Sequence, residues 1–92
     1  MVHLKRYKVL ITKKALKRLH KMPEEQQELF YLLKEELAEK GAVRSNWPNY
    51  SKLGKIAHHC HLSNRWVAVW RLEKNSIEVE VYYVGSREDA PY

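Results

Sequence analysis

The chain has 92 residues, of which 45% are hydrophobic and 30% are charged. The length predicts a single domain over residues 1–92. The composition excludes a disordered chain, which carries too little apolar surface to form a core. No run approaches the roughly 20 apolar residues of a membrane span, and the start lacks the apolar stretch of a signal peptide. We therefore expect a cytoplasmic protein with no membrane partner, and the single cysteine, Cys60, allows no internal disulfide.

The net charge of +6 is distributed unevenly along the chain. Residues 1–22 contain eight Lys and Arg and no acidic residue, and residues 42–72 contain five and again no acidic residue. For residues 1–22 a solvated basic helix face is the simpler interpretation. In residues 42–72, tryptophans and histidines are interleaved with the basic residues, and this pattern favours anion binding that weakens with salt.

The first half of the chain predicts one strand and two helices. Residues 3–11 mix apolar and basic side chains, as an opening strand does. Thr12 can cap the helix that follows, in which apolar residues recur at helical spacing. A second helix is expected between Pro23, which suits a first turn, and Gly41, which suits the position just past a helix end. Together these helices predict an α-hairpin with apolar stripes turned towards a sheet.

The second half predicts a loop and three strands. Residues 42–55 read as a loop, and strands are expected at Ile56–Leu62, Arg65–Leu72 and Ile77–Val84, joined by short turns. In the last strand, strict alternation puts Ile77, Val79, Val81 and Tyr83 on one face. The predicted fold is thus α+β, with the order β-α-α-β-β-β, and an α-hairpin covers one face of a twisted antiparallel sheet. The other face is left for a partner.

A run of histidines lies on the first strand of this meander. Because strand side chains alternate, His59 and His61 share one face, while His58 and Cys60 share the other. Metal-independent RNA hydrolysis needs a base for the 2′-hydroxyl proton, an acid for the 5′-oxygen, and cations for the charged phosphorane. Histidine and arginine supply these groups near neutral pH, and an aromatic ring can stack an unpaired base.

Each of these residues also has a structural interpretation. His58 is expected to face the helices, and Cys60 is expected to be a small core residue. Trp66 and Trp70 have the alternation of core residues. Zinc is the competing interpretation of the histidines, but a structural site normally has four ligands, and the sequence offers no second pair.

The segment LGKIAHHCHLSNRWVAVWRLEKNSIEVEVYYVGSRE resembles the C-terminal half of toxins of the RelE/ParE superfamily. The likeness in sequence covers roughly residues 50–92. It implies an extended sheet packed on an α-hairpin, and RNA-cleaving members act on mRNA in the ribosomal A site. The subgroup most similar in motif is YafQ-like, with a Cys-His-Leu strand at residues 60–62, a three-residue link, and then a tryptophan.

The resemblance assigns roles residue by residue. The catalytic histidine of the YafQ-like strand falls on His61, and two alternating lysines of RelE fall on His59 and His61. The acidic residue of the YafQ-like link is replaced by Arg65. The terminal histidine motif becomes Gly-Ser-Arg ending at Arg87, and the aromatic terminus corresponds to Tyr92.

The strand register decides whether His61 and Arg65 share a face. If His61 pairs opposite Trp66, it is separated from Arg65. If His61 pairs opposite Val67, it joins Arg65. Both registers are open at this point.

The hypothesis is the toxin of a type II toxin–antitoxin system, acting as a ribosome-dependent mRNA endoribonuclease without metal or cofactor. The candidate catalytic residues are His61, His59, Arg65, Arg87 and Tyr92. The candidate RNA-binding residues are Lys52, Lys55, Arg71 and Trp47. The resemblance also implies a cognate antitoxin, through which alone operator DNA is bound. The alternatives are a ParE-like, non-nuclease toxin acting on DNA gyrase and a non-catalytic basic RNA-binding module.

Overall fold

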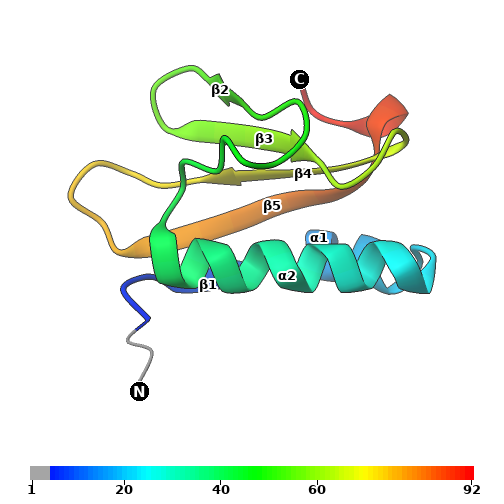
Figure 1. Cartoon of the computed structure of the whole chain (residues 1–92), viewed down its shortest axis with the longest axis horizontal. Helices are drawn as coiled ribbons and strands as arrows, with labels where there is room; N and C mark the ends of the chain where they lie inside the picture. Colours follow the sequence, from blue (N-terminus) through cyan, green and yellow to red (C-terminus); the bar gives the residue numbers. More distant parts are fainter. Residues whose placement is uncertain (1–4) are drawn as a thin grey trace.

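The computed structural model describes residues 5–92 and arranges them as a sheet with helices against it (Figure 1). Residues 3 and 4 of the predicted opening strand lie outside the described residues. The elements in chain order are β1 (Lys8–Ile11), α1 (Lys13–His20), α2 (Glu24–Lys40), β2 (Ser51–Leu53), β3 (Ala57–His61), β4 (Trp66–Arg71), β5 (Glu78–Ser86) and the 3-10 helix η1 (Arg87–Asp89).

The described strands form one sheet in the order β1-β5-β4-β3-β2. Strands β2 to β5 are antiparallel neighbours, and β1 pairs with β5 in parallel. The predicted α+β fold and its antiparallel meander are therefore confirmed. The loop predicted at residues 42–55 is wrong at its end, where β2 pairs with β3. The three residues of β2 include two exposed polar side chains and show no alternation that would predict a strand. They form a strand because β3 offers hydrogen-bonding partners.

The helices begin and end at the residues that the sequence indicates. The Thr12 hydroxyl oxygen accepts a hydrogen bond from the backbone N–H of Ala15 at 3.2 Å, which caps α1. Gly41 ends α2 with a φ of +93°. A Cβ at this position would lie 3.0 Å from the Tyr7 ring, so both the backbone angle and the packing require glycine.

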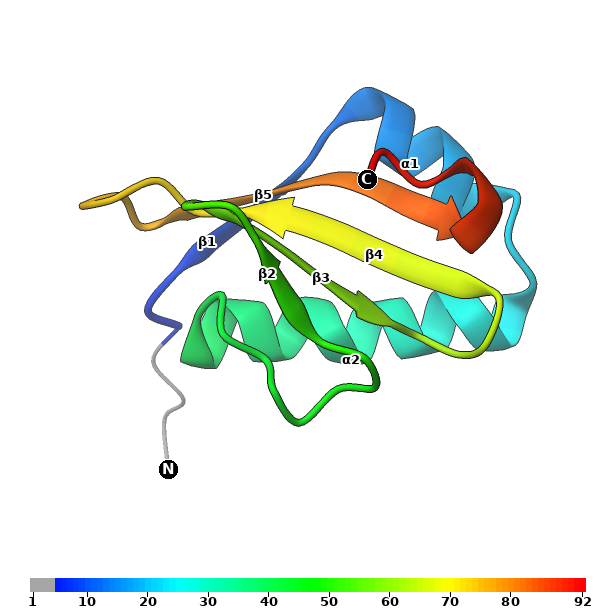
Figure 2. The ribbon, with the colours of Figure 1, turned by 90° about the horizontal axis from the view of Figure 1, so that it is seen from above.

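One face of the sheet carries the main core. Helix α2 crosses this face, and α1 runs beside β5 (Figure 2). The fully buried core side chains include Leu19, Phe30, Leu33, Leu37, Cys60, Trp70, Val79, Val81 and Val84. Burial raises the pKa of the Cys60 thiol to about 12, in keeping with the predicted inert core position.

His58 also faces the helix side, as predicted. Its ring stacks on Trp70 with a centroid distance of 6.0 Å, and its Nδ1 lies 2.7 Å from the hydroxyl oxygen of Tyr50. Trp66 and Trp70 both contact the main core, which confirms the prediction of core packing for these two tryptophans.

The opposite face of the sheet, called the open face below, differs from the prediction in β5. Val69 pairs with Tyr83, whereas the next residue, Trp70, pairs with Val81, so Tyr82 is an extra residue in the strand. This bulge reverses the alternation. Tyr83 therefore does not share a face with Val81, as strict alternation predicted, but packs with Val67 and Val69 on the open face.

Candidate active site

The register between β3 and β4 resolves the question that the sequence left open. His61 pairs opposite Val67, and His59 pairs opposite Val69. Both histidines therefore lie on the open face, and Arg65 has the same parity as Val67. Of the two registers, the structure has the one that allows His61 and Arg65 to share a face.

The loop that precedes β2 contacts both the backbone and the ring of His61. Its backbone N–H donates to the carbonyl oxygen of Pro48 at 2.8 Å, and the side-chain amide nitrogen of Asn49 lies 3.3 Å from its Nδ1. Burial lowers the pKa of His61, and repulsion from His59 and Arg87 lowers it further. Both effects favour the neutral form of the imidazole.

His59 lies between His61 and the C-terminal residue. It is buried, its Nδ1 lies 3.0 Å from the Ser51 hydroxyl oxygen, and its ring centroid is 6.1 Å from that of His61. The Tyr92 ring lies over His59 with a centroid distance of 4.5 Å. The chain end thus folds back over the open face. Figure 2 shows the last residues, in red, turning back from η1 alongside β5.

The two candidate arginines lie next to each other at the end of this face. The backbone N–H of Arg87 donates to the carbonyl oxygen of Arg65 at 2.7 Å, and both side chains are exposed. They border a shallow hollow of about 310 Å³. It is lined by Arg65, Trp66, Ser86, Arg87 and Glu88. Arg87 also acts electrostatically on His61 and Tyr92, so it connects the hollow to the histidines.

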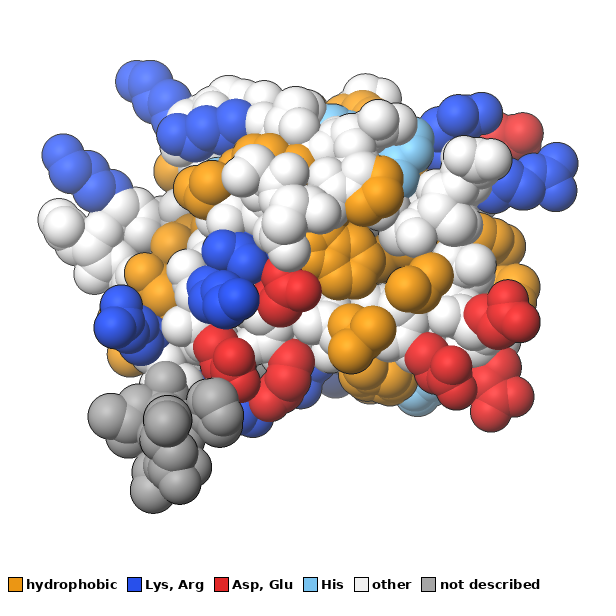
Figure 3. Space-filling model, in the orientation of Figure 1, with side chains coloured by type: hydrophobic (Ala, Val, Ile, Leu, Met, Phe, Trp, Pro, Cys, Tyr) orange, Lys and Arg blue, Asp and Glu red, His pale blue; other side chains and the backbone are white. Residues whose placement is uncertain are grey.

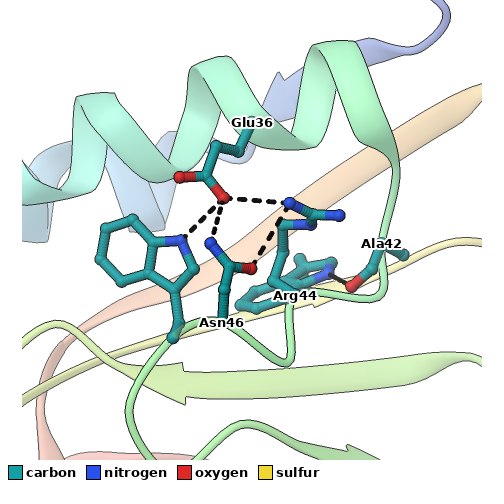
Figure 4. Close-up of polar contacts among 6 residues, drawn as sticks. Glu36, Ala42, Arg44 and Asn46 are labelled. Atoms are coloured by element: carbon teal, nitrogen blue, oxygen red, sulfur yellow. Dashed lines mark hydrogen bonds and ion pairs between the residues drawn. The ribbon is translucent and has the colours of Figure 1, made fainter.

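The side chain of Glu36 on α2 anchors the loop that holds the histidines (Figure 4). Its Oε1 accepts hydrogen bonds from Asn46 at 2.8 Å, from Trp47 at 3.0 Å and from Arg44 at 3.0 Å. Burial raises the pKa of Glu36, but these three hydrogen bonds and the Arg44 charge outweigh it and hold the pKa below its ordinary value. The loop is therefore fixed before it reaches Pro48 and Asn49.

We expect Glu36→Gln to lower the free energy of unfolding by about 1–2 kcal/mol at neutral pH, because charge-assisted hydrogen bonds become neutral ones. The pKa of Glu36 is lowered in the folded state. Its contribution is thus present above the unfolded pKa of about 4.3 and is lost as the pH falls through the folded pKa. Urea unfolding of the wild type and of Glu36→Gln, at neutral and at acidic pH, measures the difference in their free energies of unfolding. An equal difference at both pH values would contradict the assignment.

The four candidate RNA-binding residues do not gather with the histidines. Trp47 donates to Glu36 and packs on the main core. Lys52 pairs with His58, so its parity is that of the helix side. Lys55 lies in the turn before Ala57, at the other end of β3 from His61. Arg71 forms an ion pair with Glu80 and lies over the Tyr82 ring at 4.7 Å, also at that far end.

Asn49 and Ser51, which contact the catalytic candidates, were not predicted. Both lie within residues 42–55, where a loop was expected, and this holds for Asn49, whose φ is +52°. Their roles come from the pairing of β2 with β3, which aligns Ser51 with His59. These two contacts could be predicted from the sequence only if the pairing of β2 with β3 were already known.

We expect Arg87→Gln to raise the pKa of His61 towards the ordinary value of about 6.5, because the substitution removes a repulsive charge. An NMR titration of the His61 ring protons measures the shift. Arg6→Gln, at an exposed site before β1, serves as the control that leaves this pKa unchanged. A His61 pKa that is unchanged or lower in Arg87→Gln would show that Arg87 does not act on His61.

Within residues 5–92, no group of three His, Cys, Asp or Glu side chains is placed to hold a metal ion. In the same residues, none of the helices combines the length and the apolar character needed to cross a membrane.

The strand order and the two helices against one face of the sheet give this chain a fold that is similar to those of several solved toxin structures. Structures with this fold include archaeal RelE in the RelE–RelB complex from Pyrococcus horikoshii, with a TM-score of 0.73, 15% identity, and coverage of 92% of this chain and 99% of that chain. A chain of the E. coli DinJ–YafQ toxin–antitoxin complex has a TM-score of 0.75, 10% identity, and coverage of 95% and 99%. The isolated E. coli RelE toxin has a TM-score of 0.71, 20% identity, and coverage of 92% and 88%.

No protein-family model matches the sequence, and no curated protein matches it. The likeness is therefore one of structure. It confirms the predicted RelE-like fold.

Proposed function

We propose that the chain is the toxin of a type II toxin–antitoxin system and cleaves mRNA on the ribosome in the cytoplasm. The observation that carries the proposal is the position of His61. This histidine faces the open side of the sheet, and its neutral form is favoured by burial and by the charge of Arg87. The fold shared with RelE and YafQ structures supports a toxin, and the residues around His61 support RNA chemistry.

The reaction assigned to this site is an internal phosphoryl transfer. The 2′-oxygen of the message attacks the adjacent phosphorus, its proton leaves, and the bond from phosphorus to the 5′-oxygen breaks as that oxygen gains a proton. The products are a 2′,3′-cyclic phosphate and a 5′-hydroxyl. His61 takes or gives a proton with His59 assisting, Arg87 and Arg65 stabilise the phosphorane, and Tyr92 positions a base.

The contact with Asn49 sets the tautomer of His61. When the amide nitrogen donates to Nδ1, the neutral ring carries its proton on Nε2 and offers no free nitrogen to the substrate. Accepting a proton at Nε2 requires the other tautomer, with Nδ1–H donating to the amide oxygen after the amide turns over. The imidazolium formed in that way can return the proton from Nε2, so Asn49 is a positioning residue for both steps.

The proposed protein partner is a cognate antitoxin. The P. horikoshii RelE structure is a complex with RelB, and the YafQ structure is a toxin–antitoxin complex. For this chain we propose an acidic segment that covers the basic end of the open face and blocks His61. Operator DNA is bound only by the resulting complex.

Growth inhibition on induced expression tests the proposal. The wild-type chain is expected to stop growth and lower the rate of protein synthesis, whereas His61→Ala and Arg87→Ala, expressed to the same level, are not. Full inhibition by both variants would contradict the nuclease assignment. If purified protein inhibited DNA supercoiling by gyrase instead, the ParE-like alternative would replace it.

A further inference from the structure

Helix α1 carries a concentration of positive charge that lies outside the site described above. Lys13, Lys14, Lys17 and Arg18 belong to the helix, and Lys21 follows at its C-cap. Among residues 5–92, the ion pairs join Lys5 to Glu35, Arg44 to Glu36 and Arg71 to Glu80. Within this part of the chain, the cations of α1 therefore have no carboxylate partner.

The charges at the two ends of α1 act differently on the helix. Lys17, Arg18 and Lys21 lie at the C-terminal end, where the helix dipole favours positive charge. The first turn of α1 contains Lys13 and Lys14 and no acidic residue, although the N-terminus of a helix favours negative charge. Helix α2 of the same chain has Glu24 and Glu25 in its first turn. The helix dipole therefore accounts for the cations at the C-terminal end of α1 but not for Lys13 and Lys14.

The geometry connects these lysines to the arginines of the candidate active site. A hollow of about 400 Å³ beside α1 is lined by Lys14, Lys17, Arg18 and Lys21. Arg18 and Lys21 also line a second hollow of about 220 Å³, together with Trp66 and Ser86. Trp66 and Ser86 in turn line the hollow between Arg65 and Arg87. Neighbouring hollows thus share lining residues, and the three follow one another as a track.

The track is basic and partly preorganised. Six of its lining side chains are basic, and two, Glu88 and Asp89, are acidic. Arg18 lies over the Tyr83 ring at 5.1 Å, and Ser86 Oγ donates to Asp89 at 3.3 Å. Figure 2 shows α1 beside the end of β5 and η1. Figure 3 shows acidic side chains along α2 and basic ones at both ends of this face of the molecule.

We propose that this track binds the sugar–phosphate backbone of the single-stranded message outside the cleaved position, with Lys14, Lys17 and Lys21 as phosphate contacts. The inference rests on the proposed function for the identity of the RNA. Continuity with the Arg65–Arg87 hollow favours the strand that is being cut over a separate RNA. The contacts recognise phosphates, so the track adds affinity without base preference.

The test measures binding without cleavage. A labelled single-stranded RNA with 2′-deoxy nucleotides at every position that could be cut is titrated with wild-type protein and with Lys14→Gln/Lys17→Gln/Lys21→Gln. The Kd is measured by fluorescence anisotropy over a range of salt concentrations. The matched control, Lys8→Gln/Lys40→Gln/Lys74→Gln, removes the same charge from exposed sites outside the track.

The α1 variant is expected to weaken binding by at least about tenfold at low salt. Its slope of log affinity against log salt should be smaller by about 2, from three lost contacts on a single strand. The control should keep the wild-type slope. Equal slopes in the α1 variant and the wild type, or an equal loss in the control, would overturn the proposal.

Two competitors distinguish the message strand from other polyanions. Unlabelled single-stranded RNA is expected to displace the probe at lower concentration than an RNA hairpin of equal charge or polyglutamate. Stronger competition by the hairpin would assign the track to folded RNA, and stronger competition by polyglutamate would assign it to an acidic protein; either overturns the proposal. Because the probe cannot be cleaved, these outcomes are independent of whether His61 is catalytic.

Discussion

His61→Ala is expected to reduce ribosome-dependent cleavage by about 100- to 10 000-fold, the usual contribution of a general acid or base. The imidazole, whose neutral form is favoured, is held on the open face by the Pro48 carbonyl and the Asn49 amide, so alanine removes the proton-transfer group and leaves the backbone contact. The rate of single-turnover cleavage on programmed ribosomes measures this effect. Because His61 is only partly buried, the thermal unfolding midpoint should change little.

His58→Gln provides the matched control, since it changes the neighbouring histidine on the other side of the same strand. His58 is 4% exposed, stacks on Trp70 and contacts Tyr50. We expect this variant to unfold more easily and to cleave at nearly the wild-type rate under conditions where it is folded. If His58→Gln lost cleavage while His61→Ala kept it, the assignment of the two faces would be wrong.

Arg87→Ala is expected to lower cleavage by about 100- to 1000-fold, the range measured when a donor that stabilises a developing negative charge is removed. Arg87 lines the hollow, and its backbone N–H donates a hydrogen bond to the carbonyl oxygen of Arg65. Its positive charge lowers the pKa of His61. The rate constant at saturating protein should fall more than the apparent affinity, because the phosphorane charge exists only in the transition state.

Arg87→Lys separates charge from geometry. Lysine keeps the positive charge but cannot make a bidentate contact with phosphate, so we expect partial recovery of the rate. Arg6→Ala removes an exposed arginine that precedes β1, far from Arg87 in the sequence, and should leave the rate unchanged. Equal rates in Arg87→Ala and the wild type would exclude a role for Arg87 in stabilising the phosphorane.

The parts of the fold that the sequence predicted are those governed by local signals. Thr12, Pro23 and Gly41 mark helix boundaries because capping and backbone geometry depend on one or two residues. Alternation in β3 and β4 placed His58 on the core side and the two tryptophans in the core. These features need no knowledge of which segments pair.

The parts that the sequence did not predict depend on pairing between distant segments. Strand β2 exists only against β3, and the same pairing brings Ser51 to His59. The bulge at Tyr82 reverses which side chains of β5 lie on each face of the sheet. No residue type in the strand predicts this bulge. The register of His61 was likewise undetermined, because a change of one residue in the β3–β4 link moves every side chain to the other face.

The candidate site was predicted unevenly for the same reason. His61, Arg65 and Arg87 lie at or next to strand ends, and His59 lies two residues before His61 in β3, with Tyr92 folded back over it. The candidate RNA-binding residues were chosen for residue type within a basic stretch, and pairing sends Lys55 and Arg71 to the other end of the sheet. The lysines of α1 line hollows that follow on from the one bordered by Arg65 and Arg87. Their sequence is nevertheless that of an ordinary basic helix face.

The most direct test of the proposed function is to incubate purified protein with programmed ribosomes and map the 5′ ends of the mRNA, with free mRNA and His61→Ala as controls. The account predicts cuts at defined positions in the A site that appear with wild-type protein on ribosomes and disappear with His61→Ala. Intact mRNA on ribosomes, from a folded protein that still stops growth, would contradict the nuclease assignment.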